Sequence, residues 1–355
     1  MKLTSTPIIA GLMSGTSLDG LDIAVCQFNQ QDEGWGYRIL AAATIPYPEE
    51  WTDKLRMAYH MQGRDLWELH VQFGRYCGVQ LRNLLDERGL KAEMAVSHGH
   101  TVFHQPSSGY TVQIGDGAAL AAASGLPVVC DLRSLDVAHG GQGAPLVPLG
   151  DALLFGEFAA CINLGGYGNI SFDSAGTRLA FDICPVNNIL NLLARKEGFA
   201  YDKGGHLASK GAIDAVLLQE WNALPYYHLT GPRSLGQEWF EAEFLGILNR
   251  HNLEVPDLLR TATEHIAMQL ARVLEVVDPG QVLFTGGGCF NTFLLKRIRH
   301  HIRHTPVVPD EILINYKEAL IFAFLGLLRV QEKDNCLASV TGARRNCSGG
   351  AIYLP

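Results

Sequence analysis

The chain has 355 residues, of which 47% are hydrophobic and 18% charged, and its net charge is −8. This composition is typical of a globular protein, and the length favours two domains over one. The negative charge argues against a general nucleic-acid surface, and no apolar run approaches the roughly 20 residues of a membrane span. The N-terminus has no pattern of a secretion signal, and the eight cysteines form no CxxC pair. We therefore expect a reduced, cytoplasmic protein that binds neither nucleic acid nor membranes.

The opening stretch predicts a strand, a glycine-rich loop and a second strand. Ile8–Ala10 and Ile23–Val25 are short runs of β-favouring residues, and Gly11–Asp22 between them contains three glycines and three hydroxyl residues. Backbone N–H groups of such a loop can hold an anion without a basic side chain. Asp19 and Asp22 in this loop suit a divalent cation or an activated water. The alternative is an ordinary glycine-rich hairpin.

Further along, strands alternate with helices. Residue periodicity predicts strands and helices at 38–45, 49–59, 65–87, 93–97, 111–114, 118–123 and 128–131, in chain order. This order indicates an α/β fold. His98, Asp116 and Arg133 follow three of the strands, at the edge of the sheet where ligands of α/β proteins collect.

The glycine-rich segment 139–145 predicts a crossing between two domains, which we expect to span residues 1–132 and 133–355. The second part repeats the opening theme, with a strand at 160–164, a turn at 165–168 and a returning strand at 169–172. The remaining expected elements are two strands and six helices, at 179–183, 187–193, 212–221, 239–248, 256–277, 281–284, 291–300 and 319–331.

Three glycine-rich elements need one explanation. Two are strand–loop–strand hairpins, and the third, Gly286–Gly288, joins a strand to a helix. Hairpins of this kind can grip a polyphosphate, and the third turn lets a nucleotide lie close to the backbone. This pattern predicts the two-domain actin-like ATPase (ribonuclease H-like) fold, with a nucleotide cleft between the domains. A dinucleotide-binding fold is disfavoured because Gly11 and Gly15 lack the G-x-G-x-x-G spacing, and a Walker A loop because no Gly-Lys-Ser/Thr occurs.

Motifs spread over the chain resemble those of one family. They are 11–20 (GLMSGTSLDG), 97–106 (SHGHTVFHQP), 113–116 (QIGD), 131–138 (DLRSLDVA), 140–148 (GGQGAPLVP), 163–170 (NLGGYGNI), 286–291 (GGGCFN) and 339–343 (SVTGA). In this order they resemble the anhydro-N-acetylmuramic acid kinases. The resemblance implies an ATP-dependent enzyme of peptidoglycan recycling, which opens the 1,6-anhydro bond of anhydro-N-acetylmuramic acid with water and phosphorylates O6. The products are N-acetylmuramic acid 6-phosphate and ADP.

The resemblance also implies the catalytic base. In the family it is the aspartate of an Asp-Thr-Gly-Pro-Gly-Asn motif, which here corresponds to Asp182 through Asn187. Ile183, Cys184 and Val186 depart from the family's Thr, Gly and Gly. Valine disfavours positive φ, so we expect a different backbone around Val186. The alternative role for Asp182 is a cap of the helix that follows.

The other implied roles concern ATP, Mg²⁺ and the sugar. The expected phosphate and nucleotide contacts are Gly15, Thr16, Ser17, Leu18, Asp19, Gly20, Leu21, Asp22, Gly165, Gly166, Gly286, Gly287, Gly288 and Asn291. Asp19 or Asp22 is expected near Mg²⁺. The expected substrate residues are His98, Asp116, Arg133 and Asn187. The Arg133 guanidinium suits the lactyl carboxylate of the sugar, and its alternative is an ion pair with Asp131 or Asp136. The resemblance also suggests a homodimer.

Several alternatives remain open in the sequence. His98, His100 and His104 have a spacing that could hold zinc, but no cysteine or carboxylate follows at ligand spacing, so a place beside the sugar is favoured. Tyr226 and Tyr227 could stack on a sugar or pack in the core. The alternative functions are a kinase of a plain sugar hydroxyl with the same fold, and a catalytically impaired relative that binds ATP or sugar.

Overall fold

The chain forms two compact units in the computed structural model, which describes residues 2–15, 18–31, 34–231 and 233–355. The first unit contains residues 1–154 together with 316–355, and the second contains 155–315. Within the described residues, no helix combines the length and apolar character needed to cross a membrane.

The first unit is built on a seven-stranded sheet. Its strands are β1 (Ile8–Ser14), β2 (Gly20–Gln31), β3 (Gly34–Pro46), β4 (Met94–Gln105), β5 (Tyr110–Ile114), β6 (Val128–Cys130) and β12 (Ala351–Tyr353). Their order is β12-β6-β4-β1-β2-β3, and β5 pairs with β4 off this path. β2 runs antiparallel to β1 and β3, whereas β4 runs parallel to β1 and β6.

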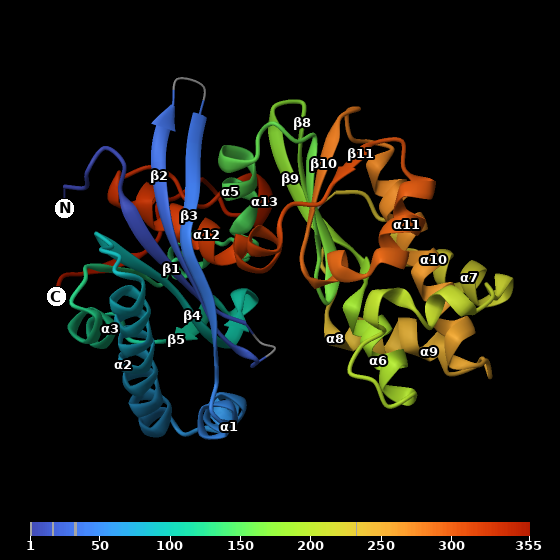
Figure 1. Ribbon diagram of the computed structural model, residues 1–355, viewed down its shortest axis with the longest axis horizontal. Coiled ribbons are helices and arrows are strands. Elements are labelled where there is room, and N and C mark those ends of the chain that lie inside the picture. The colour runs from blue at the N-terminus through green and yellow to red at the C-terminus, as the bar shows by residue number, and fades with distance from the viewer. Residues whose placement is uncertain (1, 16–17, 32–33, 232) are drawn as a thin grey trace. The chain divides into compact units, whose positions relative to one another are not determined.

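Helices cover both faces of this sheet. They are α1 (Glu49–Met57), α2 (Gly63–Arg88), α3 (Gly117–Ser124), α4 (Ser134–Ala138), α5 (Val147–Leu154), α12 (Glu311–Val330) and α13 (Ala338–Thr341). Ala10 and Leu12 share a core with Phe73 of α2. The intervening Gly11 faces α12, where an added Cβ would collide with the carbonyl oxygen of Ala319. In Figure 1 the red α12 accordingly lies beside the blue first strands, although they are far apart in the chain.

The second unit has a five-stranded sheet. Its strands are β7 (Ala160–Leu164), β8 (Tyr167–Ser174), β9 (Thr177–Pro185), β10 (Gln281–Thr285) and β11 (Thr305–Val307), in the order β11-β10-β7-β8-β9. Its longer helices are α6 (Asn187–Lys196), α7 (Ala215–Asn222), α10 (Val255–Leu274) and α11 (Thr292–His301). The short α8 (Gln237–Trp239) and α9 (Leu245–Leu248) flank one π-helical segment at Phe240–Phe244.

Both sheets share one topology. In each, three strands form an antiparallel meander, and two later strands add in parallel beside the first strand of the meander. This is the arrangement of the ribonuclease H-like fold, and it confirms the predicted two-domain, actin-like fold class.

The predicted boundary between residues 132 and 133 differs from the division in the structure. The chain leaves the first unit after Leu154 and returns to it at Tyr316. The glycine-rich segment 139–145 lies inside the first unit, where Gly141 and Gly143 pack against Asp136 and Val137. The return of the chain brings α12 against the first sheet, where Gly11 of β1 packs on Ala319.

Candidate active site

The β1–β2 turn is shorter than the predicted loop. Gly11 lies in β1, while Gly20, Leu21 and Asp22 lie in β2, so the turn between the two strands spans 15–19. Leu18 adopts a positive φ of 59° and Asp19 is exposed, whereas the Leu21 side chain is in the core. Thr16 and Ser17 fall outside the described residues.

Asp22 is a partly buried carboxylate at the start of β2. It accepts a hydrogen bond from the Thr44 hydroxyl at 2.5 Å. Burial raises its pKa, and the charge of Asp19 raises the pKa further, against the lowering effect of the Thr44 bond. A carboxylate whose charge is unfavourable in this way gains from a nearby cation, so the pair Asp19 and Asp22 fits a divalent metal ion.

A buried network that sequence patterns did not indicate fixes the end of β1. The Tyr47 hydroxyl donates to Ser14 Oγ at 2.8 Å, and Ser14 Oγ lies 3.1 Å from His100 Nδ1. Since Ser14 accepts from Tyr47, its own proton points to Nδ1, which makes His100 the neutral Nε2–H tautomer. Burial lowers the pKa of His100 to about 4, consistent with that tautomer. Ser14 and His100 come together because β1 and β4 pair in parallel, and a single sequence does not reveal this pairing.

Arg133 is held by His98 rather than by a carboxylate. Its Nε and Nη2 lie 3.0 and 2.8 Å from His98 Nε2, and its Nη1 donates to the carbonyl oxygen of Gly143 at 2.6 Å. His98 Nε2 therefore accepts, and Nδ1–H donates to the carbonyl of Gly99 at 2.8 Å. The proposed ion pairs of Arg133 with Asp131 or Asp136 are not found among the described residues.

The His98–Arg133 pair carries one positive charge. Burial, and then the charge of Arg133, lower the pKa of His98 to about 3. Burial lowers the pKa of Arg133 to about 10, with Glu318 on α12 acting in the opposite direction. The guanidinium stays cationic at neutral pH and the imidazole stays neutral. Glu318 was not among the predicted residues, because its helix is distant in sequence from Arg133.

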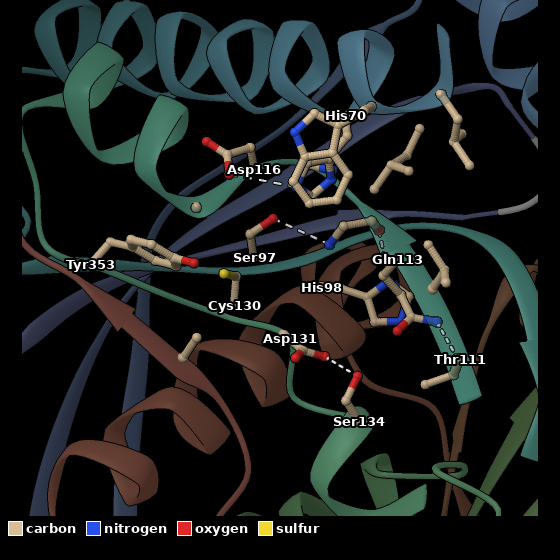
Figure 2. Close-up of a pocket in the computed structure, with 18 of the residues that line it drawn as sticks. His70, Ser97, His98, Thr111, Gln113, Asp116, Cys130, Asp131, Ser134 and Tyr353 are labelled. Carbon is tan, nitrogen blue, oxygen red and sulfur yellow. Dashed lines mark hydrogen bonds and ion pairs between the residues drawn. The ribbon is translucent and has the colours of Figure 1, made fainter. Parts of the chain in front are cut away.

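A pocket of about 280 Å³ lies within the first unit. Figure 2 shows its polar lining, which comes from α2, β4, β5, β6, α4, β12 and the residues just before α3 and just after β6: His70, Ser97, His98, Thr111, Gln113, Asp116, Cys130, Asp131, Ser134 and Tyr353. The predicted substrate residues His98 and Asp116 thus share one pocket, and Arg133 contacts its lining through His98. His98 and Asp116 offer hydrogen-bonding groups and a carboxylate to a polar ligand, and the Arg133 guanidinium contacts His98 Nε2.

Asp116 has two functions in this pocket. Its Oδ1 accepts from the backbone N–H of Ala119 at 2.7 Å and so caps α3. Its Oδ2 lies 3.5 Å from His70 Nε2, while His70 Nδ1 accepts from the N–H of Gly115 at 3.1 Å. Burial lowers the pKa of His70, although the Asp116 carboxylate opposes this effect. His70 also lines the pocket. The sequence predicted the helix that contains His70, but it did not indicate a role for this side chain in the pocket.

The three histidines proposed for zinc do not converge. The nitrogens of His98 contact Arg133 and Gly99, whereas His100 Nδ1 contacts Ser14. His104 Nδ1 lies 3.1 Å from the Thr111 hydroxyl. Within the described part of the chain, these histidines belong to no group of three or more potential metal ligands. The favoured interpretation, a place beside the pocket, remains for His98.

In the second unit, the β7–β8 turn is tied to the start of α6. The carbonyl of Gly165 accepts from the N–H of Asn187, and that of Gly166 accepts from the N–H groups of Val186 and Asn188. Asn187 Nδ2 also donates to the carbonyl of Leu164 at 2.9 Å. The hairpin turn and the helix start therefore form one rigid unit of backbone.

The turn after β10 packs closely on the same hairpin. Gly286 has φ 83°, and an added Cβ there would collide with Asn163. At Gly288 a Cβ would lie 2.7 Å from that of Leu164. Asn291 then caps α11 by accepting from the N–H of Leu294 at 2.9 Å. Gly286 and Gly288 thus pack against the end of β7, and the nucleotide contacts expected of Gly165, Gly166 and Gly286–Gly288 stay a prediction.

Asp182 lies inside β9, not after it. Its Oδ2 accepts from the N–H of Leu235 at 2.9 Å. Its backbone N–H donates to the carbonyl of Arg233, and its carbonyl accepts from the Tyr226 hydroxyl at 2.7 Å. Burial raises the pKa of Asp182, and the Leu235 N–H partly opposes this. The alternative role as a helix cap is wrong, because α6 begins at Asn187 and Val186 is its N-cap residue.

The three residues that depart from the family motif are core residues here. Ile183, Cys184 and Val186 are all buried in the hydrophobic core of the second unit. Val186 has φ −118°, which suits a valine, and its side chain fills the space beside Gly168 and Gly288. Tyr226 and Tyr227 are also core residues, as the packing alternative predicted, although Tyr226 additionally holds the Asp182 backbone.

Comparison with known proteins covers nearly the whole chain. The profile of the family described as "Anhydro-N-acetylmuramic acid kinase" matches residues 7–355. A relative of that name from Saccharophagus degradans is 34% identical over 98% of this chain and 99% of its own. One from Vibrio vulnificus is 31% identical over 99% of each chain. Among solved structures, the activator of the 2-hydroxyisocaproyl-CoA dehydratase from Clostridium difficile with bound ADPNP has a TM-score of 0.45 at 15% identity, covering 91% of this chain and 97% of that one.

The fold and these matches first define the chain as a two-domain kinase of the ribonuclease H-like class. More narrowly, it belongs to the anhydro-N-acetylmuramic acid kinase family.

Proposed function

We propose that this chain phosphorylates 1,6-anhydro-N-acetylmuramic acid with ATP and water, giving N-acetylmuramic acid 6-phosphate and ADP. The whole-chain family match supports the reaction class. The observation that carries the mechanism is the Asp182 carboxylate, which is fixed by one backbone N–H and has a raised pKa. A carboxylate of this kind is a stronger base than an exposed one and is held in one orientation.

Asp182 acts as the general base. Oδ2 is held by the Leu235 N–H, so the rest of the carboxylate is free to accept a proton from the attacking water. The water oxygen bonds to C1 of the sugar as the C1–O6 bond breaks, and O6 takes the γ-phosphoryl group from ATP. The water proton passes to Asp182, and ADP leaves. The Tyr226 hydroxyl fixes the backbone of Asp182 and so maintains the position of the base.

His98, Asp116 and Arg133 bind the sugar from the first unit. A guanidinium has five N–H groups, and the contacts to His98 and Gly143 use about three of them. The remaining donors on the two terminal nitrogens can bind the lactyl carboxylate. Asn187 of the second unit, whose Nδ2 already holds the Leu164 carbonyl, retains its amide oxygen as an acceptor for a sugar hydroxyl.

The residues present fit ATP and Mg²⁺. Gly286 and Gly288 pack against the β7–β8 hairpin, whereas a Cβ at Gly287 would meet only Asn187 Nδ2, at 3.7 Å, so the backbone at Gly287 is open enough for a nucleotide to lie close to it. Gly15, Thr16, Ser17, Leu18, Asp19 and Gly20 would hold the phosphates, and Asp19 and Asp22 the metal ion. Bound Mg²⁺ would neutralise charge on the phosphates. The raised pKa of Asp22 agrees with a carboxylate arranged for a cation.

We further propose a homodimer that works in the reduced cytoplasm during cell-wall recycling. None of the eight cysteines forms a disulfide in the structure, which supports a reducing compartment.

The test is turnover in ¹⁸O-labelled water. Purified protein, ATP and synthetic anhydro-sugar should give a product whose mass shows one phosphoryl group and one solvent oxygen at C1. A kinase of a plain sugar hydroxyl would give a phosphorylated product without solvent oxygen. Label-free product, or the absence of turnover with Mg²⁺ present, would contradict the proposal.

A further inference from the structure

Three potential metal ligands meet in the first unit, and none of them lines the pocket of Figure 2. Asp136 of α4, Cys336 and Cys347 offer ligand atoms that all lie within 4.8 Å of one another. Their relative exposures are 0%, 1% and 5%, so the group is shielded from solvent. Neither cysteine lies in a motif that resembles the kinase family, and the proposed reaction uses none of the three residues.

The backbone holds the two cysteines opposite each other. Cys336 and Cys347 form an antiparallel β-bridge in which each N–H donates to the other residue's carbonyl, at 3.0 and 3.3 Å. Directly opposite residues of such a pair have Cα atoms about 5.5 Å apart and side chains on the same face. Cys336 Sγ is further placed by contacts of 3.6 Å with the Leu132 carbonyl and with Asn335 Oδ1. The two sulfurs are therefore positioned before any ligand binds.

The carboxylate is positioned by neutral donors. Asp136 Oδ2 accepts from the N–H of Gly143 and Oδ1 from the Thr341 hydroxyl, both at 2.7 Å. Each oxygen keeps a second lone pair. Among the described residues no ion pair is recorded for this fully buried carboxylate, and buried charges in proteins are usually paired or bound to a metal. Hydrogen bonds of this type also orient carboxylates that ligate metals.

We propose that Asp136, Cys336 and Cys347 bind a zinc ion. Two thiolates and a carboxylate are zinc ligands, and bond lengths of about 2.0–2.3 Å give tetrahedral edges of about 3.5–3.8 Å. Ligand atoms within 4.8 Å need to approach by only about 1 Å to reach these edges. Three anionic ligands around Zn²⁺ leave one negative charge, and the nearby Arg133 guanidinium, whose pKa the charges of Cys336 and Asp136 raise, balances it.

The fourth position would be taken by water or by the Leu132 carbonyl, which already contacts Cys336 Sγ. Bound zinc would tie Leu132–Asp136 to the C-terminal segment 335–348. Since Arg133 lies within Leu132–Asp136, the ion would restrict the motion of the backbone that positions the Arg133 guanidinium. The zinc site itself does not depend on the proposed reaction.

The experiment is metal analysis of the full-length chain with zinc and cobalt(II). Wild type purified under reducing conditions should retain about one equivalent of zinc after gel filtration. Cobalt(II) titrated into metal-free protein should give the visible bands of a tetrahedral thiolate site. Cys336→Ser and Cys347→Ser should abolish both signals, and Cys26→Ser, a buried cysteine on β2, should leave them unchanged.

Thr341→Ala removes the hydroxyl that donates to Asp136 and that also contacts the Leu337 carbonyl and the Ala343 N–H, but it leaves all three proposed ligands in place, and it should weaken zinc binding about 10–100-fold while the protein stays folded. This variant keeps both cysteines, so it tests the zinc site even if a cysteine variant loses zinc only because it unfolds. Three results would overturn the proposal: wild type without bound zinc, a Cys336–Cys347 disulfide in place of two thiols by mass spectrometry, or equal zinc content in the Cys336→Ser and Cys26→Ser proteins.

Discussion

At the scale of single residues, Asp182 is the position on which the proposed reaction most depends. Asp182→Asn keeps an oxygen that can accept the Leu235 N–H but removes the base. We expect kcat to fall about 10²–10⁴-fold, the usual contribution of general-base catalysis, with little change in unfolding temperature. Steady-state kinetics and thermal unfolding check this. Asp278→Asn, an exposed aspartate of the same unit, is the matched control and should retain activity. Equal activity of the Asp182→Asn and wild-type proteins would exclude Asp182 as the base.

The raised pKa of Asp182 predicts the pH dependence of the reaction. The base works only when ionised, so kcat/KM falls as the pH drops through its pKa. Burial lifts that pKa above the ordinary aspartate value of 3.8, so the acid limb should lie at a higher pH than an exposed aspartate would give. A pH–rate profile locates the limb, and the residual activity of Asp182→Asn should lack it. An unchanged limb in that variant would assign it to another group.

At the scale of elements, the sequence predicted local structure better than long-range pairing. The strand at 160–164 and the helix at 65–87 match β7 and α2, because periodicity and turn residues determine them locally. The strand expected to end at residue 97 continues to Gln105, because β5 pairs with its second half. Asp182 likewise lies inside β9 rather than beyond it. Such extensions depend on a partner strand, which alternation within one segment does not reveal.

The same limit applies to the candidate site. Glycine spacing and family motifs indicated the hairpin turns, Asp182 and the pocket residues His98 and Asp116. They did not indicate the Ser14–Tyr47–His100 network or His70, whose contacts join separate elements. They also assigned Gly11 to an anion-binding loop, whereas the structure uses it for a close approach of β1 and α12.

This role of Gly11 gives an element-scale prediction. In Gly11→Ala the new methyl group would collide with the Ala319 carbonyl, so β1 and α12 must separate. Overpacking of this kind costs about 1–3 kcal/mol or more, and we expect a loss of unfolding free energy of that size. Gly63→Ala at the start of α2, where an added Cβ meets no atom within 4 Å, is the control and should be neutral or slightly stabilising. Urea unfolding measures both, and equal stability of the two variants would contradict the packing role.

At the scale of the whole molecule, the two units repeat one topology but contribute different groups. The pocket with His98 and Asp116 and the proposed metal ligands Asp19 and Asp22 belong to the first unit. The proposed base Asp182 and the glycine turn at 286–288 belong to the second. Either unit alone would lack part of the proposed catalytic set, so the proposed reaction requires both units.

Buried neutral histidines in both units predict sensitivity to acid. Burial lowers the pKa of His98 to about 3 and that of His100 to about 4 in the first unit, and that of His265 to about 3 in the second. Below the unfolded value of 6.5 the unfolded chain binds more protons than the folded one, so stability is lost as the pH falls from about 6.5 toward these folded values. Each group contributes up to about 1.4 kcal/mol per pH unit in that window.

His265 tests this account because its partners are identified. Its ring nitrogens contact Asn222 Oδ1 at 2.7 Å and the Tyr227 hydroxyl at 3.0 Å, and His265→Gln preserves hydrogen-bonding capacity without a titrating group. Calorimetry between pH 7 and pH 5 should show a smaller loss of stability for the second unit in this variant than in wild type, whatever its stability at pH 7. His228→Gln, an exposed histidine of the same unit, should keep the wild-type slope. Since the slope counts protons and not contacts, an unchanged slope in His265→Gln would mean that His265 does not titrate differently in the folded and unfolded chains.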